Sequence, residues 1–473
     1  MSVLLNRKTL TRQEEEFIVN MLTIKPVEKL PPRMKFYQEG KEAFPFFIAE
    51  KQDVRLPYAF GRLFLKSKAS VDDFPNNKKD HHPINVTFTG ELRPRQKKKV
   101  EKLDLFFEEY RTATFCAHTG FGKTRVANYY IAKFKLLTVV LVPGTQLMEQ
   151  WPKAIAELLP NAQVGVVGED YREELLDLDN LWGDIGDVTK ASRHPDILIC
   201  MPDRWQKIPE EVRKKVGFLI VDEAHMFCTT TRSVPLLQFE PKYILALTAS
   251  PRRRDGTMGV IHSLCGLHQV KAKYLNPVTV WRFLTGLEFQ TAKNVRNQTN
   301  WVGTLKRIVE DEERNEMLAD FAEYLITVMG RKPLFMCERK YHVTDLLKKI
   351  GTRGLSCDSL MGNKNTYHDS QVLLAIMKKA GTGFDEQYAC PEFNGIRIDT
   401  VVYCSSFKEI NGLIQYGGRA FRDDNPLIVH FVDKNGIVEG HWREAQKYYK
   451  SGEYLKNVTI KTIKPEDIWE VVE

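Results

Sequence analysis

Short runs of apolar, β-branched residues alternate along the chain with stretches in which apolar residues recur every three or four positions. The runs are nearly continuous, which is typical of strands covered on both faces and hence of a parallel sheet between helices. They fall into a first series at residues 112–116, 138–143, 196–200, 217–221 and 243–248, and a second at residues 333–337, 372–375, 400–403 and 427–432. We therefore predict an α/β protein with two tandem domains of similar build.

The first part of the chain lacks this rhythm. It is rich in proline and lysine, and its polar stretch at residues 72–82 is typical of a loop or linker. We predict an accessory region at residues 1–85, a first α/β domain at residues 86–270 and a second at residues 271–473, with the junction near residues 266–274.

Composition adds modest constraints. The chain has 473 residues, of which 43% are hydrophobic and 27% charged, so it is long enough for two or three globular domains. Its net charge of +8 suits a polyanionic partner without requiring one. No run approaches the roughly 18 apolar residues of a membrane span, so we expect an intracellular, soluble protein with no membrane partner.

The eight cysteines include no Cys-x-x-Cys pair, and several lie inside apolar runs. We expect them to be reduced, buried and small hydrophobic side chains, not zinc ligands or disulfides.

The stretch Ala117-His-Thr-Gly-Phe-Gly-Lys-Thr124 follows a predicted strand and opens a helical pattern. In that context Gly120 and Gly122 allow backbone N–H groups to close on phosphates, and the helix N-terminus favours the anion. Lys123 would reach the β and γ oxygens, and the Thr124 hydroxyl would hold Mg²⁺. The sequence therefore predicts a nucleoside triphosphate site.

Two carboxylates and a histidine, Asp222-Glu-Ala-His225, follow the predicted strand at residues 217–221. Ligands of parallel sheets bind at the carboxyl ends of the strands. Asp222 would hold the Mg²⁺ shell and Glu223 would orient or deprotonate the attacking water. A surface Asp-Glu pair is the alternative, but it is improbable about 100 residues after a phosphate loop on the same sheet.

The second domain carries Gln415-Tyr-Gly-Gly-Arg-Ala-Phe-Arg422, with two arginines three positions apart. If this segment is helical, Arg419 and Arg422 share one face and could reach a γ-phosphate held by the first domain. The alternative is a surface helix end whose arginines pair with acids such as Asp423 and Asp424.

Taken together, these three segments resemble the superfamily 2 helicases and translocases over nearly all of residues 90–435. The resemblance implies tandem RecA-like domains, use of ATP with Mg²⁺ and a nucleic-acid partner. Ala117 stands where the general phosphate-loop pattern has glycine, and alanine is common there in this superfamily. Asp222–His225 would be its DEAH-type box.

Further segments occur in family order, and the resemblance assigns them roles. Residues 92–96, 143–151, 201–204, 248–251 and 381–385 are similar to the glutamine motif and to motifs Ia, Ib, III and V. The implied nucleotide contacts are Gln96, Thr119, Gly120, Gly122, Lys123, Thr124, Gly383, Asp385 and Gln415. The implied nucleic-acid contacts are Pro143, Gln150, Trp151, Arg204 and Thr382. The implied coupling residues are His225, Thr248 and Ser250.

The loop Gly-Phe-Gly-Lys-Thr, the Gln-Trp pair at residues 150–151 and Arg254-Asp-Gly256 are similar to a subgroup of DNA helicases. That subgroup includes the eukaryotic repair and transcription-initiation helicase, some phage helicases and the poxvirus-type transcript-release helicases of large DNA viruses. Met201 and Ser250 stand where threonine is usual, which bears on the detail of coupling.

Two basic runs and three aromatic residues have alternative interpretations. Residues 97–99 are predicted to form a solvated face, whereas residues 252–254 adjoin motif III and could equally contact phosphate. Trp151, Trp205 and Phe227 could stack on bases, although packing in the core is the expectation favoured for each.

The sequence thus predicts an ATP-driven nucleic-acid motor, with DNA favoured over RNA and a monomer favoured. Proteins of transcription, replication or repair would be its partners. A duplex translocase or an RNA helicase is the nearer alternative. A nucleotide-switched binding module is more distant, because a switch has little use for Glu223 together with both arginines.

Overall fold

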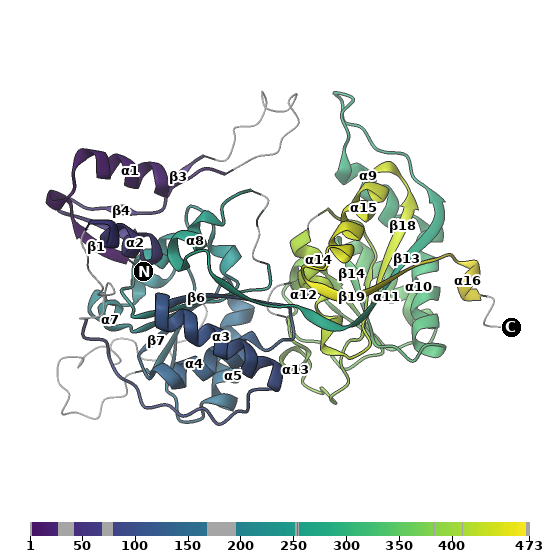
Figure 1. Cartoon of the computed structure of the whole chain (residues 1–473). Helices are drawn as coiled ribbons and strands as arrows, with labels where there is room; N and C mark the ends of the chain where they lie inside the picture. The colour runs from purple at the N-terminus through teal and green to yellow at the C-terminus, as the bar shows by residue number, and fades with distance from the viewer. Residues whose placement is uncertain are drawn as a thin grey trace. The chain divides into compact units, whose positions relative to one another are not determined.

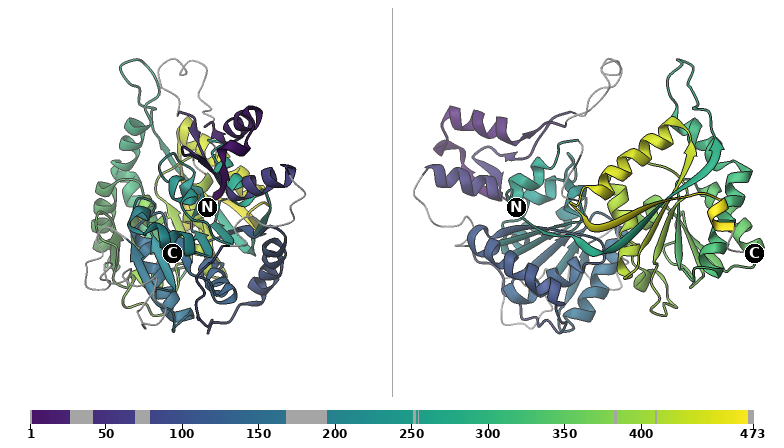
Figure 2. Two further views of the ribbon diagram at one scale, coloured as in Figure 1. Left: turned by 90° about the vertical axis from the view of Figure 1, so that its left-hand side faces the viewer. Right: turned by 45° about the vertical axis from the view of Figure 1, so that its right-hand side comes forward.

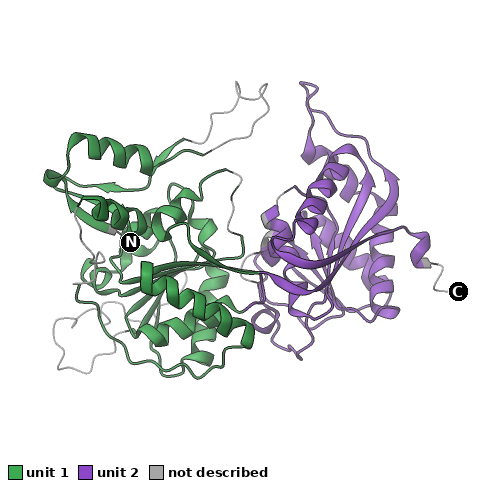
Figure 3. Cartoon of the chain, in the orientation of Figure 1, with its two compact units in different colours: residues 1–117, 122–272 green, residues 118–121, 273–473 purple. Residues whose placement is uncertain are grey.

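The computed structural model describes residues 2–26, 42–68, 79–167, 195–250, 253, 255–381, 384–408 and 410–469. It divides into two compact units (Figure 3). Unit 1 comprises residues 1–117 and 122–272, and unit 2 comprises residues 118–121 and 273–473. The domain limits predicted at residues 85 and 270 remain predictions.

Unit 1 is built on a seven-stranded sheet in which all described neighbours are parallel. Across the sheet the strands are β12 (Gln269–Ala272), β6 (Thr112–Ala117), β11 (Tyr243–Thr248), β10 (Phe218–Val221), β7 (Thr138–Leu141), β9 (Ile197–Cys200) and β8 (Val164–Val167). The accompanying helices are α3 (Pro94–Tyr110), α4 (Lys123–Phe134), α5 (Thr145–Leu158), α7 (Glu210–Lys215) and α8 (Gly259–Cys265), as Figure 1 shows. This order brings β6, β11 and β10 together at the centre.

Strand register in unit 1 aligns the carboxyl ends of the central strands. Val221, the last residue of β10, pairs with Leu141 of β7 and with Ala246 of β11. Thr248 of β11 in turn pairs with Cys116 of β6. Since the strands are parallel, the segments that follow β6, β7, β10 and β11 all leave the sheet at one edge.

Unit 2 repeats this plan with its own parallel seven-stranded sheet. The strand order is β15 (Cys357–Leu360), β16 (Val372–Ile376), β14 (Pro333–Cys337), β17 (Thr400–Tyr403), β18 (Leu427–Lys434), β13 (Tyr274–Glu288) and β19 (Leu455–Ile463). The helices are α9 (Trp301–Val309), α10 (Glu312–Thr327), α11 (Lys340–Thr352), α12 (Met377–Gly381), α13 (Glu386–Ala389), α14 (Ile410–Gly417), α15 (Gly436–Lys450) and α16 (Glu466–Trp469). Helices cover both faces of this sheet (Figure 2). The predicted class, α/β with two tandem RecA-like domains, is confirmed.

The N-terminal region has a regular structure that its hydrophobic pattern does not reveal. Its strands β1 (Ser2–Asn6), β5 (Asp53–Pro57) and β4 (Ile48–Ala49) form an antiparallel sheet, and β2 (Thr23–Ile24) pairs with β3 (Phe44–Pro45). Helices α1 (Arg12–Leu22) and α2 (Tyr58–Lys68) accompany them, and α2 packs against α8. The strands are short, so they offer little period-two signal.

A buried ion pair fixes α10 to the sheet of unit 2. Arg314 is fully buried, and its Nε donates to Asp433 Oδ1 at 2.9 Å while Nη1 donates to the Cys404 carbonyl at 2.9 Å. Thr285 Oγ1 donates to the same carboxylate oxygen at 2.8 Å. Breaking such a pair would leave an uncompensated buried charge, at a cost of about 3–5 kcal/mol.

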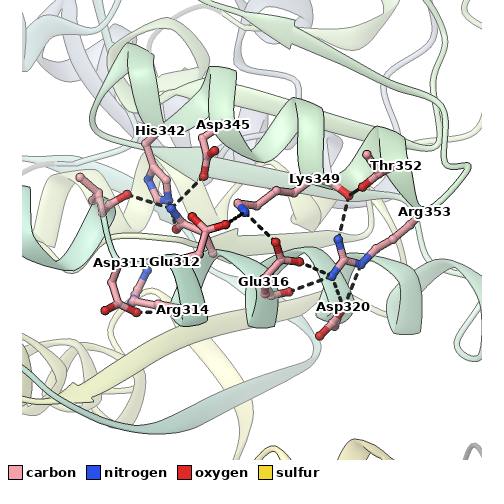
Figure 4. A network of polar contacts seen from close by, with 12 residues as sticks. Asp311, Glu312, Arg314, Glu316, Asp320, His342, Asp345, Lys349, Thr352 and Arg353 are labelled. Atoms are coloured by element: carbon pink, nitrogen blue, oxygen red, sulfur yellow. Dashed lines mark hydrogen bonds and ion pairs between the residues drawn. The ribbon is translucent and has the colours of Figure 1, made fainter.

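A second network joins the exposed sides of α10 and α11 (Figure 4). Lys349 bridges Glu312 and Glu316, and Arg353 contacts Glu316 and Asp320. The acidic partners are 39–76% exposed, and ion pairs with such exposed partners contribute little individually, so we regard the network as fixing the register of the two helices.

Two further expectations concern the cysteines and membrane-spanning helices. All eight cysteines are free and seven of them are buried, as predicted. Among the described residues, none of the helices combines the length and apolarity that a membrane crossing demands.

Two buried histidines in unit 2 predict a pH dependence of stability. Burial lowers the pKa of His342 and of His430 from 6.5 to about 3. Between these values the unfolded chain binds protons that the folded chain excludes, so the free energy of unfolding falls as pH falls below about 6.5. Each group contributes up to about 1.4 kcal/mol per pH unit.

In His342→Gln, the urea concentration at half-unfolding should therefore fall less steeply between pH 6.5 and 4.5 than in the unsubstituted protein. The difference should correspond to the uptake of up to one proton on unfolding. The glutamine can still bond Asn315, which lies 3.0 Å from His342 Nε2. An unchanged slope would show that His342 does not contribute.

Candidate functional site

The predicted phosphate loop joins β6 to α4. Every residue of β6 is buried, and α4 begins at Lys123 with Gly122 as its N-cap. Gly120 has φ +83° and Gly122 has φ +91°, values that favour glycine because a Cβ would be strained there. Lys123 Nζ donates to the Ala117 carbonyl at 3.2 Å. The loop therefore presents backbone N–H groups and one ammonium at a helix N-terminus, which suits a polyphosphate.

Gln96 lies against this loop. It is 1% exposed on α3, and its Oε1 accepts from Arg93 N at 2.8 Å. A Cβ built on Gly122 would lie 2.4 Å from Gln96 Nε2, so the loop and the amide are in close contact. The glutamine of the glutamine motif, which the resemblance implies as a nucleotide contact, is thus adjacent to the residues assigned to phosphate.

Asp222 follows directly after the last residue of β10 and is only 4% exposed. Its Oδ1 accepts from Glu223 N at 2.9 Å and its Oδ2 accepts from Trp151 Nε1 at 2.9 Å. Burial, together with the charge of Glu223, raises the pKa of Asp222 to about 6, while the Trp151 hydrogen bond and the Lys123 ammonium oppose that rise. Lys123 and Asp222, which come from different strand ends, are thus close enough to interact electrostatically.

Glu223 has a strained backbone and an available acceptor. Its φ is +46°, in the left-handed region that side-chain-bearing residues rarely adopt. The buried Oε2 atom has no hydrogen-bond partner among the described residues, and Nδ1 of His225 lies 3.5 Å from it. Such outliers concentrate at functional sites. A carboxylate oxygen without a donor can accept a hydrogen bond from a water molecule, which is the role predicted for Glu223.

The three predicted coupling residues lie together. His225 Nδ1 is 3.0 Å from Thr248 Oγ1, and that hydroxyl donates to the Ser250 carbonyl at 2.9 Å. Arg253 anchors the segment, because its Nη1 donates to the His225 carbonyl at 2.6 Å and its Nη2 pairs with Asp255 at 2.7 Å. The segment after β10 is therefore tied to the segment after β11.

Unit 2 holds its two predicted arginines in a polar cluster. Arg419, 4% exposed, donates to the Phe384 and Gly381 carbonyls. Arg422 forms ion pairs with Asp385 and with Glu386. Although burial opposes ionisation of Asp385, the charges of Arg422 and Arg397 hold its pKa below the usual range.

This cluster identifies the acids that pair with Arg422 and the partners of Asp385. The acids that pair with Arg422 are Asp385 and Glu386, not Asp423 and Asp424. Asp385 also caps α13 by accepting from Gln387 N at 3.1 Å, so its carboxylate already has structural partners. Gln415 lies on α14, half-buried.

The predicted nucleic-acid contacts have mixed environments. Pro143 is buried, whereas Gln150 and Arg204 are partly exposed. Trp151 is 1% exposed, so its ring offers no face to a base in this structure. Phe227 is fully buried, as favoured, and Trp205 is half-buried beneath the Arg213 guanidinium. Thr382, Gly383, Arg252 and Arg254 lie outside the described residues.

Three structural roles were not predicted from the sequence. They are the indole donor on Asp222, the Arg253–Asp255 pair that holds His225, and the buried Glu386 that pairs with Arg422. Glu386 follows directly after Asp385, so an acidic pair next to motif V was a visible signal. The other two depend on contacts across the fold that spacing along the chain does not reveal.

The chain is similar to several known proteins. The family model described as "Type III restriction enzyme, res subunit" matches residues 89–253. A protein of Invertebrate iridescent virus 3 named as helicase 109L is 29% identical over 242 residues, covering 50% of this chain and 69% of its own. The protein named as helicase 161L of Invertebrate iridescent virus 6 is 24% identical over 437 residues, covering 86% and 90%. The protein named as ATP-dependent RNA helicase L396 of Acanthamoeba polyphaga mimivirus is 25% identical over 437 residues, covering 87% and 77%.

Two of these relatives are matched over most of both chains, and the matched family model includes the phosphate loop and the Asp222–His225 box. The chain is therefore an ATP-hydrolysing helicase that acts on nucleic acid, and it is similar to the superfamily 2 helicases of large DNA viruses and phages.

Proposed function

We propose that this helicase acts on DNA and uses ATP hydrolysis to separate its strands. The observation that carries the proposal is the set of chemical groups at one edge of the unit 1 sheet. A glycine-rich loop with Lys123, a buried Asp222 and an under-bonded Glu223 all follow central strands there. The match of residues 89–253 to a restriction-enzyme family supports DNA as the substrate.

We assign the residues of unit 1 as follows. Lys123 and the loop N–H groups bind the phosphates of ATP, Gln96 contacts the base, and Thr124 and Asp222 hold Mg²⁺. The metal, when bound, supplies charge stabilisation for phosphoryl transfer. Glu223 orients the attacking water through its Oε2 atom. The donor set fits because oxygen ligands are those that Mg²⁺ prefers.

In unit 2 we assign Arg422 as the arginine finger, with Arg419 in support. The ion pairs to Asp385 and Glu386 keep the Arg422 guanidinium in one orientation, which lowers the entropic cost of presenting it to a phosphate. The Arg419 bonds to two backbone carbonyls restrain the segment before α13 relative to the segment after α14.

RNA is the second candidate substrate, because the mimivirus relative is named as an RNA helicase. A duplex translocase is also compatible with the same ATP site, since strand separation needs more than hydrolysis. We further propose that its protein partners belong to transcription, replication or repair, as the subgroup resemblance implies.

Arg422→Ala should lower the nucleic-acid-stimulated kcat for ATP by about 10³-fold or more, because an arginine finger is worth 10³–10⁵. Arg397→Ala is the matched control, since Arg397 pairs with the same two acids, Asp385 and Glu386. Its kcat should stay within about tenfold of the unsubstituted protein. Normal hydrolysis by Arg422→Ala would refute the finger assignment.

Glu223→Gln should lower kcat by about 10²–10⁴-fold while ATP affinity is retained, because the amide keeps the size of the side chain but cannot act as a base. Lys123→Ala should instead abolish ATP binding. Lys133→Ala, on the same helix and paired with Asp104, controls for charge and helix effects. Equal loss of ATP affinity in Glu223→Gln and Lys123→Ala would contradict the separate roles.

The substrate assignment predicts that single-stranded and duplex DNA stimulate ATP hydrolysis more than RNA does at equal nucleotide concentration. Half-maximal stimulation should require more DNA at higher salt, because bound phosphates release counterions. ATPase rates with the three polymers at two salt concentrations measure both effects. Strand-displacement and triplex-displacement assays then distinguish unwinding from tracking, and stronger stimulation by RNA would favour the second candidate.

A further inference from the structure

The buried indole of Trp151 makes a contact that core packing alone does not require. Trp151 is 1% exposed on α5, and its Nε1 donates to Asp222 Oδ2 at 2.9 Å. A buried indole N–H needs an acceptor, but a neutral backbone carbonyl would serve. Here the acceptor is a carboxylate that we assign to the metal, and charge-assisted bonds of this kind are about twice as strong as neutral ones.

The contact removes the rotational freedom of that carboxylate. The terminal torsion of an aspartate is broad, so one hydrogen bond leaves the plane of the carboxylate poorly fixed. Asp222 has a donor on each oxygen, Glu223 N on Oδ1 and Trp151 Nε1 on Oδ2. Each oxygen retains a further lone pair that can accept from a metal-bound water.

The hydrogen bond to Asp222 comes from helix α5, which includes part of motif Ia. Helix α5 carries most of residues 143–151, the segment that resembles motif Ia, and Gln150 precedes Trp151 directly. Pro152 lies inside α5 and has no N–H, so the helical bond to the Met148 carbonyl cannot form at that point. The helix is thereby weakened next to the residue that contacts Asp222.

We propose that Trp151 is a positioning residue, whose N–H orients the Asp222 carboxylate for Mg²⁺ and ties it to helix α5. This proposal rests on the assignment of Asp222 to the metal. It gives motif Ia a role inside the ATP site, in place of the nucleic-acid contact that the resemblance implies for Trp151.

The test compares binding of a fluorescent ADP derivative with Mg²⁺ and with EDTA. Trp151→Phe keeps an aromatic ring and removes the donor, so affinity with Mg²⁺ should fall by about tenfold, as for other residues that orient metal ligands. Affinity in EDTA should not change. Trp442→Phe is the matched control, because Trp442 is also buried, at 4% exposure, but lies on α15 of unit 2.

A benzothienylalanine at position 151 replaces the N–H by sulfur in a ring of nearly the same shape, and it covers the case in which Trp151→Phe does not fold. It should reproduce the same tenfold, Mg²⁺-dependent loss. Equal loss in Mg²⁺ and in EDTA, or no loss in either, would overturn the proposal.

Asp222→Asn separates this proposal from the site assignment. If Asp222 holds the metal, this variant alone should weaken Mg²⁺-dependent affinity, and adding Trp151→Phe to it should cause no further loss. A Mg²⁺-dependent affinity that Asp222→Asn leaves intact would refute the metal assignment itself. A further tenfold loss on adding Trp151→Phe to an impaired Asp222→Asn would refute only the role of Trp151.

Discussion

The parallel register of the central unit 1 strands is the constraint on which the site depends. Because β6, β11, β10 and β7 pair in parallel with their ends aligned, segments far apart in sequence leave the sheet at one edge. Burial of Asp222 at that edge then creates a physical problem, since an ionised carboxylate there needs partners. Trp151, the Glu223 amide and Lys123 supply them, so the fold and the chemistry of the site are not separable.

Much of the fold could be predicted from sequence because the central strands are continuous apolar runs. Strands β11, β14 and β17 begin and end where the hydrophobic pattern predicts. The edge strand β19 and its neighbour β13 were missed for a physical reason. The residues of β19 are mostly exposed or half-buried, and β13 alternates in burial over 15 residues. Neither strand resembles the continuous apolar runs of the central strands.

The same distinction applies to the site. The phosphate loop, the Asp222–His225 box and the arginine segment have fixed local spacing, so their chemistry is visible in the sequence. Partners that come from elsewhere are not. Trp151 is separated from Asp222 by 71 positions, and nothing about a tryptophan after a glutamine predicts a bond to a carboxylate. Arg422 and Glu386 are similarly remote, at 36 positions.

The two units divide the chemistry that we propose. Unit 1 supplies Lys123, the acidic ligands and a histidine bonded to Thr248, whereas unit 2 supplies a preorganised guanidinium pair. The most direct test of the central claim is the rate of nucleic-acid-stimulated ATP hydrolysis by Asp222→Asn at saturating Mg²⁺. Loss of metal-mediated charge stabilisation predicts a fall of at least about a hundredfold. A rate within a few-fold of the unsubstituted protein would contradict the account.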